Sequence, residues 1–440
     1  MSPRKVTGGG VSPLSGGAPR NASQGSIKGC LHIEWQSLTW GEIVDLEYGK
    51  SLRDYKNQNF GYRVFGSNGP IGWCEKKLAD GPGVILGRKG AYRGVQFSHN
   101  AFYVIDTAYY LKPKIDLDMR WLYYAVIFHN LGEIDDGSPI PSTTRSAVYV
   151  RSVEVPPLPI QKAIAHILGA LDDRIELCRR MNETLESMAR ALFKDWFIDF
   201  GTVHAKMEGR VPPGLSPEIA ALFPSKLVES ELGEIPEGWE CGSILKLARL
   251  LSGGTPKTSE LEYWDGEIPW ASAKDVSQCG QGFLIQTERT ITKRGLEESS
   301  TKMIPALSTV VVARGATTGR LTMFGIDMAM NQTCYGLYSR IGTPFSLYCH
   351  SKHFMESMVL SAHGSVFDTI TTGTFEATPV LLPSVSSLKA FEQQVTPHFE
   401  QILTNLRKVA SLSTLRDTLL PKLLSGELSV PEAMLQVEAA

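Results

Sequence analysis

Apolar residues between positions 164 and 196 fall in one narrow row. Alternating steps of four and three residues lead from Ile164 to Trp196 through apolar side chains and a single polar one, Asn182. A spacing of 3.5 residues keeps one stripe of a helix turned toward a partner along its whole length. The pattern therefore predicts a long helix that pairs with a second helix. The apolar positions expected in this helix-pairing seam are Ile164, Leu168, Leu171, Ile175, Leu185 and Leu192.

A second seam lies 227 residues further along the same chain. Seven of the ten shifted positions are apolar and the register is unbroken, which favours an internal repeat over two unrelated helices. The three polar positions are His398, Asn405 and Arg416, so we expect less uniform packing along this row. The apolar positions named for the second half of the seam are Phe391, Val395, Ile402, Leu412 and Leu419.

The repeat extends upstream of the two helices. The same offset aligns Thr144 with Thr371 and Pro156 with Pro383. Each half also carries an apolar run that leads into a basic glycine loop, VILGRKGAYRG (84–94) and VVVARGATTGR (310–320). β-Branched residues that lead into glycines predict a strand followed by a surface loop. The sequence thus predicts an α+β fold with two globular domains and two long helices that pair as an antiparallel coiled coil.

We expect seven segments along the chain, since glycine, proline and charge mark the connections. At about 1.5 Å per residue, helices of this length would be rods of about 60 Å. An antiparallel pair needs a long linker between the halves, and an alternative is that both helices belong to a bundle core. The segments are a disordered leader (1–30), a first domain (31–157), a first helix (158–200), a linker (201–238), a second domain (239–384), a second helix (385–426) and a tail (427–440).

Composition places the chain among folded proteins with no global charge bias. Hydrophobic residues make up 42% of the 440 residues, charged residues 20%, and the formal net charge is −2. The seven cysteines form no Cys-x-x-Cys pair, which favours reduced thiols over a disulfide framework. No stretch approaches 18 consecutive apolar residues, so we expect a cytoplasmic protein that has no membrane partner.

Several stretches resemble catalytic or metal-binding motifs but lack essential members. Gly49-Lys50-Ser51 resembles the end of a phosphate-binding loop, yet Val44 occupies the place of the required earlier glycine. Cys349, His350 and His353 lie close together without a fourth metal ligand. We therefore predict no catalytic residues, no metal and no cofactor on this chain.

Local charge in the first half indicates a DNA surface. Nine lysines and arginines stand against four acids between Glu47 and Arg93, a local excess of +5. Cations position a protein on phosphates, while arginine, lysine and amide side chains can read base edges. The candidate DNA-binding residues of this half are Lys50, Arg53, Lys56, Asn68, Arg88, Lys89, Tyr92, Arg93 and Arg145.

The second half is less basic and richer in hydroxyls and amides. Ten basic residues stand against eight acids from Lys246 to Arg320. A difference of this kind between the halves would mean two different subsites, while the alternative is an ordinary solvated surface. The candidates in this half are Lys257, Ser272, Lys274, Arg314, Thr317, Thr318, Arg320 and Gln332.

Six stretches of the chain carry a resemblance to a known family. They are GSNGPIGW, GRKGAYRG, SGGTPKTSELEYWDGEIPW, NQTCYG, PKLLSGEL and, after the first domain, PPLPIQKAIAHILGALDDRIELCRRMNETLESMARALFKDWFIDF. From about Glu34 to Val430 the chain resembles the specificity subunits of type I restriction-modification systems. This resemblance implies two target-recognition domains that each read one part of a split double-stranded DNA site. The paired helices would fix the unspecified gap between those parts.

The resemblance also implies partners. Two methyltransferase subunits would dock on the helices, and motor-nuclease subunits would join that assembly. AdoMet, ATP and Mg²⁺ would belong to those partners. A different interpretation is a coiled-coil scaffold whose globular heads bind proteins and never DNA, and a third is a self-contained nuclease or methyltransferase, which the missing motifs disfavour.

Overall fold

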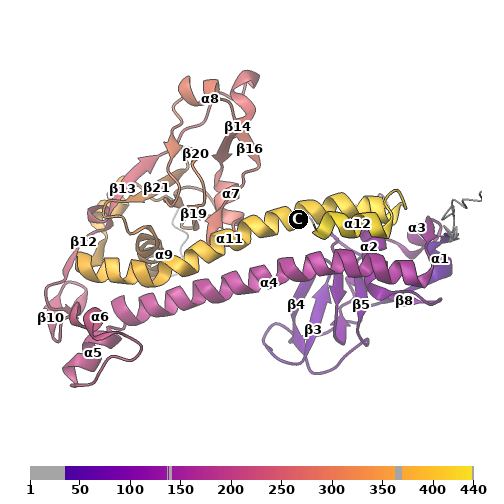
Figure 1. Ribbon diagram of the computed structural model, residues 1–440, viewed down its shortest axis with the longest axis horizontal. Helices are drawn as coiled ribbons and strands as arrows, with labels where there is room; N and C mark the ends of the chain where they lie inside the picture. Colours follow the sequence, from indigo (N-terminus) through magenta and orange to yellow (C-terminus); the bar gives the residue numbers. More distant parts are fainter. Residues whose placement is uncertain (1–34, 136, 138–140, 362–368, 439–440) are drawn as a thin grey trace, which may run out of the picture.

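Two long antiparallel helices form the axis of the molecule (Figure 1). The computed structural model describes residues 35–135, 137, 141–361 and 369–438. Helix α4 (Leu158–Phe197) and helix α11 (Val385–Leu424) each contain 40 residues. Asp172 of α4 accepts a hydrogen bond from Arg416 of α11, and Asn182 of α4 accepts one from Asn405 of α11. Residue numbers rise along one helix as they fall along the other, so the two helices run in opposite directions. The antiparallel pairing predicted from the two seams is confirmed.

Local chemistry sets the start of each long helix. Pro159 occupies the first turn of α4, where a missing N–H costs nothing. The hydroxyl of Ser384 accepts a hydrogen bond from the Ser387 amide and caps α11.

The first domain lies at one end of the helix pair, below it in Figure 1. A four-stranded sheet has the order β2-β8-β5-β6, and a three-stranded sheet has the order β4-β3-β7. Its strands are β1 (Gln36–Thr39), β2 (Val44–Tyr48), β3 (Tyr62–Gly66), β4 (Gly69–Cys74), β5 (Gly83–Gly87), β6 (Val95–Ser98), β7 (Phe102–Val104), β8 (Ala108–Pro113) and β9 (Ser152–Val155). Its helices are α1 (Trp40–Ile43), α2 (Met119–Phe128), the 3₁₀ turn η1 (Leu131–Glu133) and α3 (Arg145–Tyr149).

The second domain lies toward the other end, above the pair in Figure 1. Its sheets have the orders β13-β21-β18-β19-β15 and β16-β14-β20-β17. The strands are β12 (Glu240–Ser243), β13 (Ala248–Ser252), β14 (Trp264–Ala271), β15 (Phe283–Leu284), β16 (Arg289–Ile291), β17 (Met303–Ile304), β18 (Thr309–Val312), β19 (Leu321–Phe324), β20 (Met328–Met330), β21 (Cys334–Ser339) and β22 (Pro379–Leu382). The helices are η2 (Ile244–Lys246), η3 (Leu261–Tyr263), α7 (Ala273–Gln278), α8 (Lys293–Glu297), α9 (Pro344–Ser361) and α10 (Thr372–Ala377).

The repeat read from the sequence is visible in the pairing of strands. In each half the strand that enters the domain pairs antiparallel with the strand that leaves it, β1 with β9 and β12 with β22. Thr144 caps α3 and Thr371 caps α10, each by accepting a hydrogen bond from an amide three residues later. The predicted fold class, a tandem repeat of an α+β domain and a long helix, is therefore confirmed.

The expected linker (201–238) and the expected tail (427–440) both contain secondary structure. The linker 201–238 contains α5 (Gly201–Met207), α6 (Pro217–Ala221) and the hairpin β10 (Leu227–Ser230) and β11 (Gly233–Pro236). The tail contains α12 (Val430–Glu438), which packs on α4 and α11. Both segments bury apolar side chains, Val203 and Phe223 in the linker and Ala433 in the tail, which explains why they are not free connections. The expected leader, residues 1–30, lies outside the described residues.

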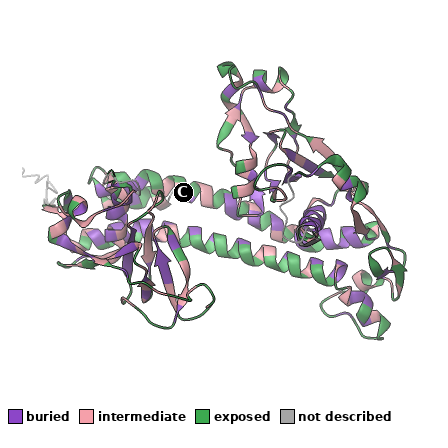
Figure 2. Cartoon of the chain, turned by 180° about the vertical axis from the view of Figure 1, so that it is seen from behind, coloured by how far each residue is buried: buried purple, intermediate pink, exposed green. Residues whose placement is uncertain are grey.

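Each domain shares its hydrophobic core with the helix pair (Figure 2). The first core joins Trp121 of α2 to Leu168 of α4 and Leu419 of α11, and the second joins Phe193, Trp196 and Phe391 to the second domain. The apolar residues named for the two seams are buried, except Leu185 and Leu192, which are half-buried, as are the polar seam residues His398 and Arg416. Among the described residues, no helix is long and apolar enough to cross a membrane.

Packing against the second domain shifts the buried stripe of α11. Phe399 and Leu406 are fully buried, although they lie next to the seam positions predicted from the sequence, His398 and Asn405. Phe399 stacks on Phe345 of α9 with ring centroids 4.6 Å apart. The stripe is therefore wider here than a two-helix seam, because a third element covers it.

Candidate nucleic-acid interface

The first domain exposes a set of unpaired cations on its loops. Lys50, Arg53 and Lys56 follow β2 and are exposed, and none has a side-chain hydrogen bond or ion pair to another described residue. Asn68 is exposed at the turn of the β3–β4 hairpin. Lys89 and Tyr92 lie on the glycine loop after β5, where the Tyr92 side chain is 78% exposed. These six side chains are free to meet a phosphate or a base.

Three other candidates of this domain are held by the protein itself. Arg88 donates to the Asp106 carbonyl at 3.0 Å, and Arg145 donates to the Leu46 carbonyl at 2.7 Å. Both guanidinium groups lie over the ring of Tyr48, 4.9 Å and 4.2 Å from its centroid. Burial, and then the neighbouring Tyr48, raise the pKa of Tyr109 to about 12. Arg88 and Arg145 thus pack at the base of the loop. Because some of their N–H donors already bond the protein, fewer remain for DNA.

Arg93 is the most constrained of the predicted DNA-binding residues. Its guanidinium donates to the carbonyls of Gly132 at 2.9 Å, Gly90 at 2.7 Å and Ile134 at 3.1 Å. These three bonds use most of a guanidinium's donors. The structure therefore argues against Arg93 as a reader of bases and for a role in shaping the loop that presents Lys89 and Tyr92.

The second domain presents a corresponding loop between β18 and β19. Arg314, Thr317 and Arg320 are exposed there, while the Thr318 hydroxyl donates to the Gly315 carbonyl at 2.7 Å and closes the loop. Gly315 has a φ of +100°, a conformation that glycine adopts without strain. Arg314 forms an isolated bridge with Thr369, as Lys89 does with Ser142, so the two glycine loops are structural equivalents.

The remaining candidates of the second domain lie on two further segments. Lys257 is exposed, and Gln332 is bonded to the hydroxyl of Thr255. Ser272 caps α7 by accepting from the Asp275 amide, which is a structural role. Lys274 donates to Glu288 at 2.6 Å.

The pKa of Lys274 is influenced by residues of both domains. The hydrogen bond to Glu288 is the first cause of the raised pKa of Lys274, and Tyr92 of the first domain is among the groups that also raise it. Lys274 and Tyr92 belong to different domains and are 182 residues apart in the chain. Sequence reasoning missed Tyr48 and also Phe60, whose side chain is 62% exposed. The signal for Phe60 was an aromatic residue next to Asn57, Gln58 and Asn59.

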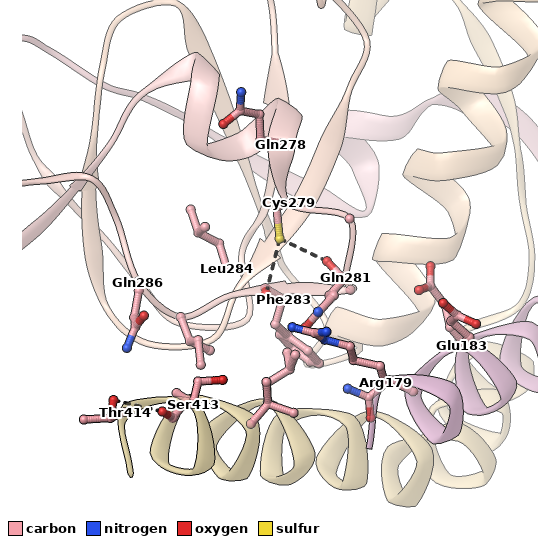
Figure 3. Close-up of a pocket in the computed structure, with 18 of the residues that line it drawn as sticks. Arg179, Glu183, Gln278, Cys279, Gln281, Phe283, Leu284, Gln286, Ser413 and Thr414 are labelled. Atoms are coloured by element: carbon pink, nitrogen blue, oxygen red, sulfur yellow. Dashed lines mark hydrogen bonds between the residues drawn. The ribbon is translucent and has the colours of Figure 1, made fainter. Parts of the chain in front are cut away.

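A groove with polar and apolar walls lies where the second domain meets the long helices (Figure 3). It has a volume of about 670 Å³ and is lined by the segment 278–286, by α4 and by α11. The Cys279 thiol donates to the carbonyls of Gln281 and Phe283, and burial raises its pKa. These contacts hold the segment in place, and the raised pKa favours the protonated thiol.

The histidine and cysteine cluster considered as metal ligands belongs to the core of α9. Cys349 and His350 are buried, and the His350 ring packs edge-on against Phe193 at 4.6 Å. Burial lowers the pKa of His350 to about 4, so the ring stays neutral. In the described parts of the chain, no three His, Cys, Asp or Glu side chains are grouped so that they could hold a metal ion.

Comparison with known families identifies the two halves. The model of the type I restriction modification DNA specificity domain matches residues 32–187 and residues 236–407. This chain belongs to that family. Each matched region comprises one recognition domain and the greater part of the long helix that follows it. The family resemblance predicted from the sequence is thus confirmed, and the chain is a specificity subunit.

Two named specificity subunits are similar to this one over most of their length. The HindI specificity subunit of Haemophilus influenzae is 27% identical over 384 residues, which are 74% of this chain and 81% of that protein. The MjaIX specificity subunit of Methanocaldococcus jannaschii is 28% identical over 329 residues, or 73% of this chain and 71% of that protein.

A solved structure shares the fold. The crystal structure of the type I restriction-modification system S subunit from M. genitalium is similar with a TM-score of 0.59 at 16% identity. The match covers 90% of this chain and 98% of that chain. The likeness therefore includes both recognition domains and both long helices.

Proposed function

We propose that this specificity subunit reads a split, asymmetric double-stranded DNA site, one part with each recognition domain. The observation that carries the proposal is the pair of equivalent glycine loops, with Lys89 and Tyr92 on one and Arg314 on the other, held on a single helix pair. Cations on such loops position the protein on phosphates, and the neighbouring amides and hydroxyls read base edges. The loops differ in sequence, so the two parts of the site differ.

The helix pair also offers a surface for protein partners. On α4, Leu177, Met181 and Met188 are 58%, 40% and 51% exposed, in a row separated by one and two turns. An exposed apolar row of this kind is typical of an interaction surface. We infer that two methyltransferase subunits dock on the helices and that motor-nuclease subunits join them. AdoMet, ATP and Mg²⁺ then serve those partners, and this chain supplies sequence recognition without catalysis.

The test is to capture the chain with the methyltransferase subunits of its cell and to map genomic adenine methylation with and without the gene. Loss of methylation at one split motif with a constant gap supports the proposal and reads the target directly. Unchanged methylation and no captured methyltransferase would sink it.

The scaffold interpretation keeps one observation in its favour, the exposed row on α4. It predicts no sequence-selective DNA affinity in the presence of methyltransferase subunits. Affinity for the split motif that falls with salt contradicts it, because counterion release accompanies phosphate binding. Cutting or methylation of DNA by the purified chain alone would instead support a self-contained enzyme.

A further inference from the structure

One helix of each recognition domain, α2 in the first and α9 in the second, packs against the helix pair. A tyrosine of each of these helices forms a hydrogen bond with α4. In the first domain the Tyr124 hydroxyl of α2 donates to Asp172 at 2.6 Å. In the second domain the Tyr348 hydroxyl of α9 donates to Glu186 at 3.0 Å. Both acceptors belong to α4, so one helix holds both domains.

The two carboxylates are fourteen residues apart, which is two heptads of the seam. At about 1.5 Å per residue they are separated by about 21 Å along the axis of α4. Two heptads bring a side chain back to nearly the same side of a helix. Asp172 and Glu186 therefore form two attachment points on one face.

The first attachment point also involves the other long helix. Arg416 of α11 donates to the second oxygen of Asp172 at 2.8 Å. Arg120 lies one turn before Tyr124 on α2. It donates two hydrogen bonds, of 3.0 Å and 2.7 Å, to Asp173, the neighbour of Asp172 on α4. Tyr124 is 1% exposed, and burial together with Asp172 raises its pKa, so the phenol keeps the proton that it donates. Asp172 thus joins the first domain to both helices.

The second attachment point is equally well reinforced. Lys352 of α9 donates to the same Glu186 oxygen at 2.5 Å. Arg190 of α4 and Glu356 of α9 form an ion pair of 2.9 Å one turn further on. Tyr348 is 3% exposed, and its ring packs edge-on against Phe399 of α11. The second domain is therefore held at a defined turn of α4 as well.

We propose that the Tyr124–Asp172 and Tyr348–Glu186 hydrogen bonds are positioning contacts that determine which gap length the subunit accepts. The inference rests on the proposed reading of a split site. The apolar contacts of α2 and α9 with the helix pair supply most of the adhesion but are non-directional. The directional bonds select one turn of α4 for each domain.

The scale of a helical turn shows why the choice of turn matters. A displacement of one turn moves a domain by about 5.4 Å along α4. Successive base pairs are about 3.4 Å apart along one strand. A domain displaced by a turn would therefore meet DNA more than one base pair from its proper position, and a site with a different gap would fit.

The experiment compares adenine methylation by the assembled methyltransferase on substrates that differ only in gap length. Tyr124→Phe and Tyr348→Phe keep the rings and remove only the hydroxyls. We expect each variant to raise the rate on gaps one base pair shorter or longer, relative to the native gap, by about tenfold or more, and the double variant to raise it further. Tyr263→Phe is the matched control, because Tyr263 donates to Glu298 inside the second domain at 2.9 Å and joins no domain to α4.

A purely structural role predicts a different pattern. It would lower methylation at every gap by the same factor and leave gap selectivity unchanged, and that result in variants with wild-type thermal unfolding would overturn the proposal. Asp172→Ala and Glu186→Ala remove the acceptors and must then show the same selectivity change as the tyrosine variants.

A second measurement needs no DNA and separates this inference from the proposed function. Spin labels carried by genetically encoded amino acids at the exposed positions Asn100 and Glu297 report the distance between the domains. We expect a broader distance distribution in the double tyrosine variant than in the wild type or Tyr263→Phe. Equal distributions contradict the positioning role, whereas a broader distribution in a chain that methylates no split motif would refute only the DNA-reading function.

Discussion

Asn182 of α4 and Asn405 of α11 meet across the seam, where the Asn405 side-chain amide donates to the Asn182 carbonyl oxygen at 2.8 Å. Both residues are buried, 5% and 4% exposed, and the Gln401 side-chain amide donates to the side-chain oxygen of Asn405 at 2.8 Å. A buried asparagine pair costs stability and specifies register, because any other register breaks the hydrogen bond between the two side chains inside the seam.

We predict that Asn182→Leu destabilises the chain by about 1 to 3 kcal/mol, since it strands the buried amide of Asn405. The double variant with Asn405→Leu should recover most of that loss, because two apolar residues then face each other. Urea unfolding of the four proteins in a double-mutant cycle measures the coupling energy. Additive losses from the two single substitutions would show that the two amides do not interact.

Lys89 and Arg93 lie on one loop, but we predict that alanine substitutions of the two residues change different properties, DNA binding for Lys89 and stability for Arg93. Lys89→Ala removes an exposed cation and should weaken DNA binding without changing the free energy of unfolding. Arg93→Ala removes three hydrogen bonds to buried or half-buried carbonyls and should destabilise the first domain by about 1 to 3 kcal/mol. Thermal unfolding and DNA titration of both variants test the contrast, and equal stability of the two would exclude the structural role of Arg93.

The cations after β2 should contribute through phosphates. Lys50, Arg53 and Lys56 have no carboxylate partner among the described residues, so each is free to release a counterion on binding. Replacing one by alanine should weaken binding to all sequences alike and reduce the slope of log affinity against log salt by up to about 0.9. A substitution that changes base preference at one position, with an unchanged slope, would identify that residue as a base reader instead.

Glu392 should make stability depend on pH. The carboxylate lies on α11 and accepts the Phe345 and Ser346 amides of α9 at 3.0 Å and 2.8 Å, yet burial raises its pKa to about 7. Because the folded state binds the proton more tightly than the unfolded chain, the contribution of Glu392 is fully present below about pH 4.5 and is lost as pH rises through about 7.

The stability of the wild type relative to Glu392→Gln should accordingly fall by up to about 3 kcal/mol between pH 4.5 and pH 7.5. Burial lowers the pKa of His350, which gives the opposite dependence, but His350 is present in both proteins and its effect largely cancels in the difference. Urea unfolding across this pH range is the measurement. A difference that grows with pH would mean that the two amide donors outweigh burial.

The sequence was most informative where a period repeats over many residues. The seams around Ile164 and Phe391 predicted two long helices, and their boundaries differ from the observed ones by no more than three residues. The offset of 227 residues predicted that Thr144 and Thr371 play equivalent parts, and both are helix caps. Local chemistry determines such features, because a cap or an apolar stripe depends on residues only a few positions apart.

Only the tertiary structure decided which of the candidate cations are free. Arg53 and Arg93 look alike in the sequence, but the carbonyls that occupy Arg93 come from a turn about 40 residues away. Asp172 and Glu186 appear to be ordinary surface acids of a helix until α2 and α9 bring tyrosines to them. Contacts between distant segments depend on how whole elements pack, and no periodicity encodes them. The sequence therefore determined the helices, the repeat and the family, while packing determined the domain attachments and the available surface.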